Sequence, residues 1–212
     1  MAIMARLRSP EGCPWDREQD HRTLRQHLLE ETYEVLETID EGDLPSLRGE
    51  LGDLLLQILF HSQLAAEEGA FDIGDVVRGL RDKLIARHPH VFGDKRIETA
   101  EGVVTEWESI KREERQQTPE EQAVAAAPKA LPALARAQTS LRKAMRAGLV
   151  RTAEQDVAAV EQALARLQEA PEEAMGELLF AAVDLARVHG VEAEQALRER
   201  VERFLKEVGG AS

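Results

Sequence analysis

Five acidic residues recur at helical spacing on two neighbouring segments of the chain. The first segment carries Glu30, Glu31 and Glu34, and the second carries Glu50 and Asp53. Residues three or four apart lie on one face of an α-helix, so each segment presents its acids together if it is helical. Like charges at these spacings destabilise an isolated helix by about 0.2–0.5 kcal/mol per pair. Something in the folded protein must therefore offset the repulsion.

The second segment places its acids on a helix that is otherwise apolar nearly all round. Four polar residues share one narrow sector of that helix: Glu50, Asp53, Gln57 and His61. Buried carboxylates without a partner either become neutral or cost stability. A divalent cation removes this cost, and Mg²⁺ suits such a site because it prefers oxygen ligands and commonly completes its shell with substrate phosphates. We therefore interpret the acids as the site of a metal-dependent hydrolase.

Two other interpretations of the acids stay open. The carboxylates can form a solvated helix face or pair with arginines such as Arg25 and Arg48, in which case the chain is a non-catalytic helical scaffold or a nucleotide-sensing module. The second alternative is a di-iron carboxylate bundle, which uses two inward-facing Glu-x-x-His motifs. The sequence offers one such pair, Glu18 with His21 at a helix start, so the scaffold is the stronger rival.

The elements that position these residues are predicted to be helices throughout. Ala, Leu, Glu and Arg dominate the composition and aromatic residues make up 4% of it, which favours an all-α fold. Asp16 is expected to cap the first helix with Gln19 behind it, and a loop is expected over residues 88–93. Helical spacing of apolar residues, with breaks at Gly and Pro, predicts helices over residues 16–41, 43–68, 72–88, 99–117, 131–147, 153–169, 171–189 and 192–208.

The two halves of the chain look related. Residues 50–56 (ELGDLLL) are echoed by residues 174–180 (AMGELLF), a self-similarity typical of a duplicated helical unit. A polar stretch rich in helix-breaking residues separates the halves. We predict an N-terminal domain over residues 1–117, a linker over 118–130 and a C-terminal domain over 131–212.

The charge balance excludes some partners. The chain carries 27 Lys and Arg residues against 40 Asp and Glu residues, a formal net charge of -13. Such a charge repels a nucleic-acid backbone and an anionic membrane, so neither is expected as a partner. Cys13 has no second cysteine to pair with, and the N-terminus lacks an apolar stretch of the length that a signal peptide or membrane helix needs. A soluble, cytoplasmic protein is expected.

The order and spacing of the acids resemble those of a known family. Residues 30–34 (EETYE) and 50–53 (ELGD) are similar to the EExxE and ExxD motifs of MazG nucleoside triphosphate pyrophosphohydrolases. Three further segments look like MazG segments in the same order: residues 13–16 (CPWD), 87–93 (RHPHVFG) and 107–111 (WESIK). The similarity is close over about residues 11–115. Weaker similarity from residue 131 to the C-terminus looks like the second repeat of the two-repeat proteins.

The resemblance implies an all-α fold of two tandem MazG-like helical-bundle repeats, with about four helices in each, and a homodimer. It also implies hydrolysis of nucleoside triphosphates between the α- and β-phosphates, which gives the nucleoside monophosphate and pyrophosphate for house-cleaning or nucleotide-pool control. The implied cofactor is Mg²⁺, with Mn²⁺ as a substitute. The implied metal ligands are Glu31, Glu34, Glu50 and Asp53. Glu30 is an additional acid that orients or deprotonates the attacking water.

Side chains on two further helices are expected to bind the substrate. Lys83 and Arg87 lie four residues apart, so both can grip adjacent phosphates from one helix face. Lys111 is a further candidate for phosphate binding, and Trp107 is a candidate to stack on the base. By spacing alone, a solvated helix face and a core tryptophan are the competing interpretations.

The second repeat departs from the motif at most of the ligand positions. Aligning the echo puts Ala174 and Glu177 at the positions of the ExxD pair, and Gln162 and Ala165 at two positions of the upstream acids. A shell that keeps one acid out of four cannot hold Mg²⁺ tightly. This repeat is therefore predicted to be catalytically silent and to serve packing, dimerisation or regulation.

Overall fold

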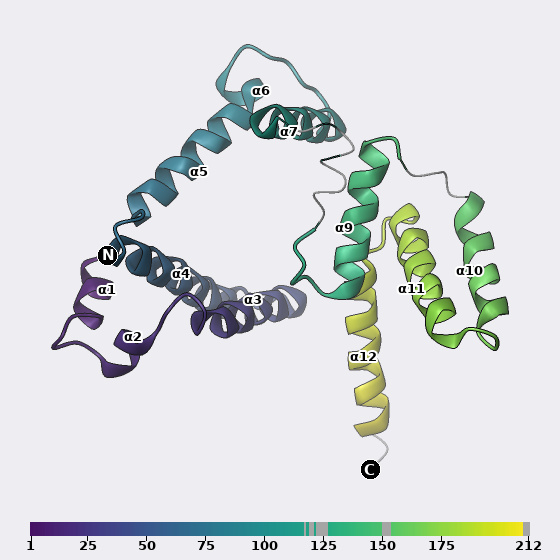
Figure 1. Cartoon of the computed structure of the whole chain (residues 1–212), viewed down its shortest axis with the longest axis horizontal. Coiled ribbons are helices and arrows are strands. Elements are labelled where there is room, and N and C mark those ends of the chain that lie inside the picture. The colour runs from purple at the N-terminus through teal and green to yellow at the C-terminus, as the bar shows by residue number, and fades with distance from the viewer. Residues whose placement is uncertain (117, 119–120, 122–126, 150–153, 210–212) are drawn as a thin grey trace. The chain divides into compact units, whose positions relative to one another are not determined.

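The described part of the chain forms eleven α-helices in a computed structural model, and it comprises residues 1–116, 118, 121, 127–149 and 154–209. Within these residues there is no β-strand, which confirms the predicted all-α fold. The chain divides into two compact units, Met1–Val103 and Val104–Ser212 (Figure 1). Most of the predicted linker lies outside the described residues. No described helix combines the length and the apolar character that crossing a membrane requires.

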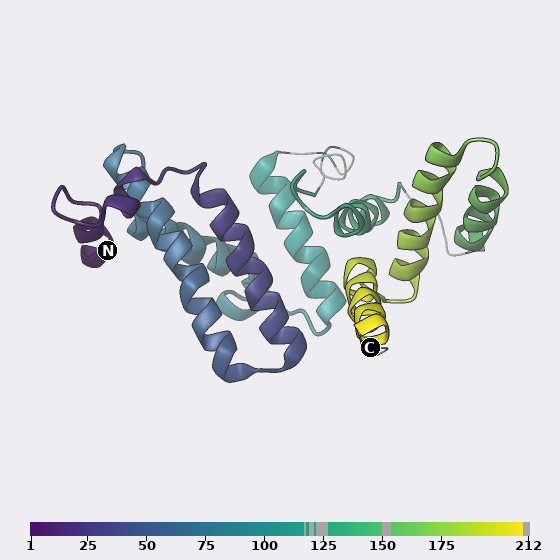
Figure 2. The same cartoon turned by 90° about the horizontal axis from the view of Figure 1, so that it is seen from below.

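Two long antiparallel helices form the centre of the first unit. α3 (Leu24–Glu41) and α4 (Leu44–Glu67) pack side by side, as both views show (Figures 1 and 2). Gly42 makes the tight connection with a left-handed φ of 70°, which costs glycine little. Asp43 then caps α4 by accepting a hydrogen bond from the N–H of Ser46 at 3.2 Å. The short connection at Gly42 thus leaves the two helices antiparallel.

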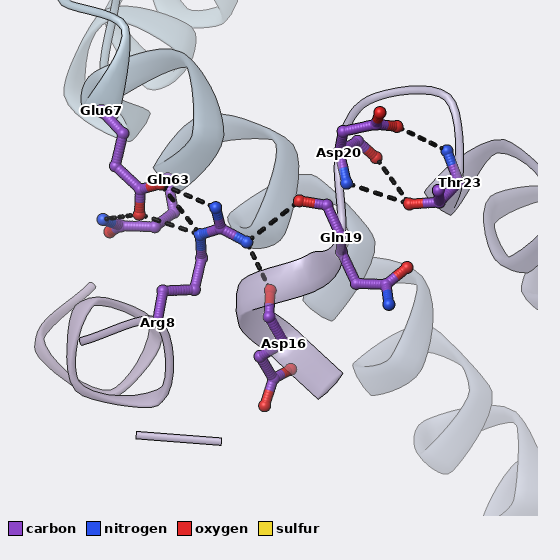
Figure 3. A network of polar contacts seen from close by, with 7 residues as sticks. All are labelled: Arg8, Asp16, Gln19, Asp20, Thr23, Gln63 and Glu67. Carbon is purple, nitrogen blue, oxygen red and sulfur yellow. Dashed lines mark hydrogen bonds and ion pairs between the residues drawn. The ribbon is translucent and has the colours of Figure 1, made fainter. Parts of the chain in front are cut away.

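The first of these helices begins later than predicted. The predicted cap at Asp16 is wrong, because Asp16 lies inside a separate short helix, α2 (Pro14–Glu18), and α3 begins at Leu24. Asp20 closes the turn between the two helices. Its carboxylate accepts a hydrogen bond from the N–H of Thr23 at 2.8 Å, and the Asp20 N–H donates in return to the Thr23 hydroxyl at 2.9 Å (Figure 3). These local bonds satisfy backbone groups that a continuous helix would otherwise use.

A largely buried arginine holds the N-terminal segment on α4. Arg8 follows α1 (Ala2–Leu7), a helix that the sequence pattern did not predict, and donates to both carboxylate oxygens of Glu67 at 2.8–3.0 Å. It also donates to the backbone carbonyls of Asp16 and Gln19 (Figure 3). The Arg8 side chain is 10% exposed. One side chain therefore ties three segments of the first unit together.

A small apolar core lies beside this arginine. Its buried members are Met4, Leu24, Phe60 and Leu64. They come from α1, α3 and α4, and burying a side chain of this size contributes about 1.5–3 kcal/mol. The Arg8 guanidinium lies 5.7 Å from the centre of the Phe60 ring, so the charged network and the core share a boundary.

Replacing Arg8 with alanine is expected to lower the free energy of unfolding by about 2 kcal/mol at neutral pH, because the charge-assisted hydrogen bonds to Glu67 and to two part-buried backbone carbonyls lose their donor. The hydrogen bond from Arg8 lowers the pKa of Glu67 below its ordinary value of 4.5. This stabilisation is therefore present above pH 4.5 and is lost as the pH falls through the lowered pKa. Urea unfolding at neutral and acidic pH measures both effects.

Arg6→Ala is the matched control for that measurement. The ion pair of Arg6 with Glu11 spans 3.7 Å, with both side chains 70% exposed, and exposed pairs contribute about 0–1 kcal/mol. If Arg8→Ala lowers the free energy of unfolding by the same amount at acidic and at neutral pH, the ion pair with Glu67 is not the source of the stabilisation.

Three helices complete the connection to the second unit. α5 (Ile73–Arg87) begins at a capping box between Asp72 and Asp75, which confirms the predicted helix start. α6 (Pro89–Phe92) adds a four-residue helix where a loop was expected. α7 (Ala100–Arg115) follows, and most of it belongs to the second unit.

The second unit contains a hairpin like that of the first. α10 (Glu154–Arg166) and α11 (Pro171–Val188) pack against each other, as α3 and α4 do (Figures 1 and 2). α9 (Ala133–Arg146) packs on α11, and α12 (Ala193–Gly209) contacts α9 and α11. All four helices predicted for the second half are present.

Candidate metal centre

Three carboxylates from the two long helices meet on the central hairpin. Glu31 of α3 and Glu50 and Asp53 of α4 each offer an oxygen within 4.8 Å of the others. Glu31 and Asp53 lie equally far from Gly42 in sequence, so the turn brings them opposite each other. Glu31 and Glu50 are half-buried and Asp53 is exposed. The sequence spacing thus becomes a group of oxygens in space.

The donor set suits a hard divalent cation. Mg²⁺ is held in proteins by a small number of carboxylates, with water and substrate phosphates in the remaining positions. The three carboxylates on the two packed helices would supply such ligands. Mn²⁺ accepts the same oxygen ligands. The residues present therefore fit the cation that the sequence predicts.

The cluster concentrates negative charge. Burial raises the pKa of Glu31 above its ordinary value of 4.5, and the neighbouring charges of Glu34, Asp53 and Glu50 add to the rise. Among the ion pairs between described residues, none joins the three clustered carboxylates to a lysine or an arginine. The arginine pairing left open by the sequence is therefore not found here. A cation would reverse the repulsion, because a nearby positive charge favours the ionised carboxylates.

The other two acids of α3 lie next to this group. Glu34 is exposed, and a hydrogen bond between its side chain and that of Glu31 contributes to the raised pKa of Glu31. Glu30 has other partners, since its carboxylate accepts a hydrogen bond from Gln26 Nε2 at 2.9 Å and lies 3.3 Å from His27 Nδ1. The structure therefore groups three of the four predicted ligands, with Glu34 beside them and Glu30 held separately.

Two polar residues continue the line of acids along α4. Gln57, one turn beyond Asp53, is 5% exposed, and its Oε1 has no hydrogen-bond partner among the described residues. His61, one turn further, places Nδ1 2.8 Å from Nδ1 of His21, with the two rings stacked. Burial, and then the neighbouring His21, lower the pKa of His61. His61 thus fastens the segment before α3 onto α4, a pairing that no local sequence pattern indicates.

The predicted substrate-binding side chains lie on α5 and α7. Lys83 and Arg87 are in the C-terminal part of α5, which leaves the hairpin at the end of α4 and runs away from it (Figure 1). Within this chain they are not brought to the carboxylates. Trp107 and Lys111 belong to the second unit, where Lys111 Nζ lies 3.1 Å from Glu108 Oε1 and 5.9 Å from the centre of the Trp107 ring. The substrate-binding roles of these four residues stay predictions.

The second unit fills the corresponding positions differently. Ala174, the counterpart of Glu50, is fully buried at 0% exposure. Glu177, the counterpart of Asp53, forms an ion pair with Arg166 at 2.6 Å. Apolar packing and an arginine thus occupy the positions where the first unit has two clustered acids, which supports the prediction of a silent second repeat.

The described residues are all-helical, and three carboxylates on the central hairpin make the chain an α-helical protein with a candidate site for a divalent cation. Residues 19–92, which contain the whole hairpin, match the family model of the MazG nucleotide pyrophosphohydrolase domain. With the relatives that follow, this match shows that the chain belongs to the MazG family. The resemblance inferred from the motifs is confirmed.

The relatives match across both units of the chain. The nucleoside triphosphate pyrophosphohydrolase of Escherichia coli (strain K12) is 46% identical over 216 residues, which cover 96% of this chain and 82% of that protein. The nucleoside triphosphate pyrophosphohydrolase/pyrophosphatase MazG of Thermotoga maritima is 42% identical over 212 residues, or 97% of this chain and 81% of that protein. The uncharacterized protein YabN of Bacillus subtilis (strain 168) is 39% identical over 214 residues, or 96% of this chain and 43% of its own length.

Proposed function

We propose that this chain is a nucleoside triphosphate pyrophosphohydrolase that cleaves between the α- and β-phosphates and releases the monophosphate and pyrophosphate. The observation that carries the proposal is the grouping of Glu31, Glu50 and Asp53 within 4.8 Å, on the hairpin that matches the family model. The E. coli and T. maritima relatives bear the name of this activity. We place the enzyme in the cytoplasm, in house-cleaning or nucleotide-pool control.

The carboxylates of the hairpin are proposed to hold Mg²⁺, or Mn²⁺ in its place. The proposed ligands are Glu31, Glu34, Glu50 and Asp53. When bound, the ion supplies positive charge that polarises a phosphate oxygen and lowers the pKa of a bound water. Three of the four proposed ligands have oxygens within 4.8 Å of one another, which supports this assignment.

Glu30 is proposed to orient the attacking water and to accept its proton. Gln26 and His27 hold its carboxylate from one turn earlier on α3, at 2.9 Å and 3.3 Å. A general base must lie within hydrogen-bonding reach of the proton it takes, and Glu30 adjoins the ligand Glu31 in the chain. A positioned base of this kind contributes about 10²–10⁴-fold to the rate.

The substrate is proposed to bind through cations outside the hairpin. A chain with a net charge of -13 repels a triphosphate unless local positive charge offsets the field. Lys83, Arg87 and Lys111 supply that charge and stabilise the phosphates as the bond breaks. Trp107 stacks on the base.

A homodimer is proposed because the first unit exposes a large apolar surface. The exposed side chains include Leu29 and Leu36 on α3, Leu51 and Leu55 on α4, and Val77, Leu80 and Leu84 on α5. Monomeric proteins rarely expose contiguous apolar patches of more than a few hundred Å². A second copy that packs α5 against the hairpin covers this surface. It also carries Lys83 and Arg87 to the carboxylates of the other protomer.

The catalytic repeat is proposed to comprise residues 1–117, joined by the linker 118–130 to a silent repeat over residues 131–212. The buried Ala174 and the ion pair of Arg166 with Glu177 support this division. The second repeat then serves packing, dimerisation or regulation.

Product analysis tests the proposed reaction. The purified chain is incubated with Mg²⁺ and a panel of canonical, deoxy and oxidised nucleoside triphosphates, and the products are separated. Pyrophosphate appearing in step with the monophosphate supports the proposal, whereas stepwise release of orthophosphate places the enzyme in another class. Calorimetry that detects no Mg²⁺ binding, with or without nucleotide, would instead favour the non-catalytic scaffold or nucleotide-sensing module.

Mg²⁺ is expected to raise the melting temperature of the chain, and EDTA is expected to reverse the rise. The ion binds the folded cluster and not the unfolded chain, so it contributes about 2.7 kcal/mol when its concentration is about 100 times the Kd. Differential scanning calorimetry measures the shift. Glu50→Ala should remove it and Glu177→Ala should keep it. A shift of equal size in Glu50→Ala would place the ion elsewhere.

A further inference from the structure

A second charged site lies in the second unit, in a cavity between α7 and α9. The cavity has a volume of about 200 Å³. Its lining includes the cations Arg112, Lys143 and Arg146, the carboxylate of Glu108, and the apolar side chains of Val104 and Ala147. All of these residues belong to the unit Val104–Ser212. The proposed hydrolysis assigns no role to the three cations.

Positive charge predominates among the described residues that line this cavity. Glu108 is the one acid among the described lining residues, and two cations share it. Its Oε1 lies 3.1 Å from Lys111 Nζ and 3.3 Å from Arg146 Nη1. Arg112 and Lys143 add two more positive charges to the same lining. In a chain of net charge -13, this local excess of cations produces a positive field where an anion can be held.

Lys143 shows the effect of that excess. Burial and the nearby charge of Lys111 lower the pKa of Lys143, Arg115 adds to the effect, and Glu108 opposes it. An ammonium group in such surroundings gains from an added anion, because an opposite charge within about 4–6 Å favours the charged form. The cavity therefore combines space, positive charge and a cation that is stabilised when negative charge enters.

We propose that this cavity binds a small phosphate-bearing anion, with inorganic pyrophosphate as the simplest form, through Arg112, Lys143 and Arg146. Guanidinium groups donate paired hydrogen bonds to phosphate oxygens, and a lysine adds a compact positive charge. Val104 and Ala147 give the cavity an apolar wall, and hydrogen bonds are stronger where the local dielectric is low. If the proposed function holds, pyrophosphate is also the product, and this site senses its accumulation.

Calorimetry of the full chain with sodium pyrophosphate tests the site. EDTA is present, so the carboxylates of the hairpin carry no metal and repel the anion. Wild type is expected to bind, more weakly at high salt. Lys143→Gln and Arg146→Gln are each expected to weaken binding about tenfold or more, because each removes one charge-assisted contact. Arg136→Gln makes the same kind of change at an exposed position of α9 outside the cavity, and it should leave the Kd unchanged.

Three results would overturn this assignment. The first is absence of binding to wild type, and the second is an equal Kd for wild type and Lys143→Gln, with circular dichroism showing that both are folded. The third is tighter binding of a nucleoside monophosphate than of pyrophosphate, which would mean that the phosphates are not the recognised part. The measurement involves no metal and no turnover, so its failure is distinct from failure of the proposed hydrolysis.

Discussion

Glu50→Ala and Asp53→Ala are each expected to abolish the hydrolysis of nucleoside triphosphates. Each removes one of three oxygens grouped within 4.8 Å. Replacing a residue that only hydrogen-bonds to a metal ligand costs about 10–100-fold in metal affinity or activity. Loss of a direct ligand should therefore lower the rate of hydrolysis by at least about 100-fold. Asp53→Asn should be equally inactive, because it keeps the shape of the side chain and removes its charge. Initial rates of pyrophosphate release at saturating Mg²⁺ measure the loss.

The second repeat supplies the control for these variants. Glu177→Ala removes the counterpart of Asp53, an acid that is paired with Arg166 at 2.6 Å and has a side chain 47% exposed. Its rate should stay within about twofold of wild type, since a surface ion pair contributes about 0–1 kcal/mol to stability. Loss of activity from this change alone would overturn the division of labour between the repeats.

The position of the acids was predictable because it depends on local rules. Helical spacing places Glu50 and Asp53 on one face, and a helix break at Gly42 returns the chain antiparallel. Glu31 and Asp53 then meet, because they lie equally far from the turn. This argument uses no contact between residues that are far apart in the sequence, apart from the turn itself. The capping box that begins α5 is likewise a local feature.

The start of α3 shows where local rules conflict. The sequence pattern predicts the helix start at Asp16. The structure instead chooses Leu24 as the first residue of α3, directly after Thr23. Arg8 donates to the backbone carbonyls of Asp16 and Gln19 and holds the segment before α3 against Glu67 of α4 (Figure 3). That choice depends on contacts between residues about sixty positions apart, which periodicity cannot reveal.

The position of the proposed substrate-binding residues Lys83 and Arg87 relative to the carboxylates could not be predicted, for a different reason. Spacing shows that Lys83 and Arg87 share a face of α5, but the direction of α5 after the turn at Gly69 depends on what that helix packs against. In the isolated protomer α5 leaves the hairpin (Figure 1), and its apolar side chains Leu80 and Leu84 stay exposed. In the proposed dimer this helix packs against a second copy, and a single sequence does not show how two copies meet.

Leu80→Glu is expected to convert the proposed homodimer into a monomer and to remove most of its activity. Leu80 is 53% exposed between Val77 at 58% and Leu84 at 45%, and the three form one stripe of α5. A carboxylate buried in an apolar interface without a partner costs several kcal/mol, and each 1.4 kcal/mol is about tenfold in the dissociation constant. Activity falls because Lys83 and Arg87 then no longer reach the carboxylates of a second copy. Light scattering after size exclusion, together with kcat/KM, measures both effects.

Arg81→Glu is the control that distinguishes loss of the apolar contact from the effect of an added negative charge on the same helix. Arg81 pairs with Asp82 at 2.7 Å and its side chain is 61% exposed, so this variant should stay dimeric. If Leu80→Glu is monomeric but fully active, Lys83 and Arg87 do not serve a second protomer and the proposed arrangement of the dimer is wrong. If it stays dimeric, the copies meet through another surface, because a glutamate in the centre of this stripe cannot be tolerated at a packed apolar interface.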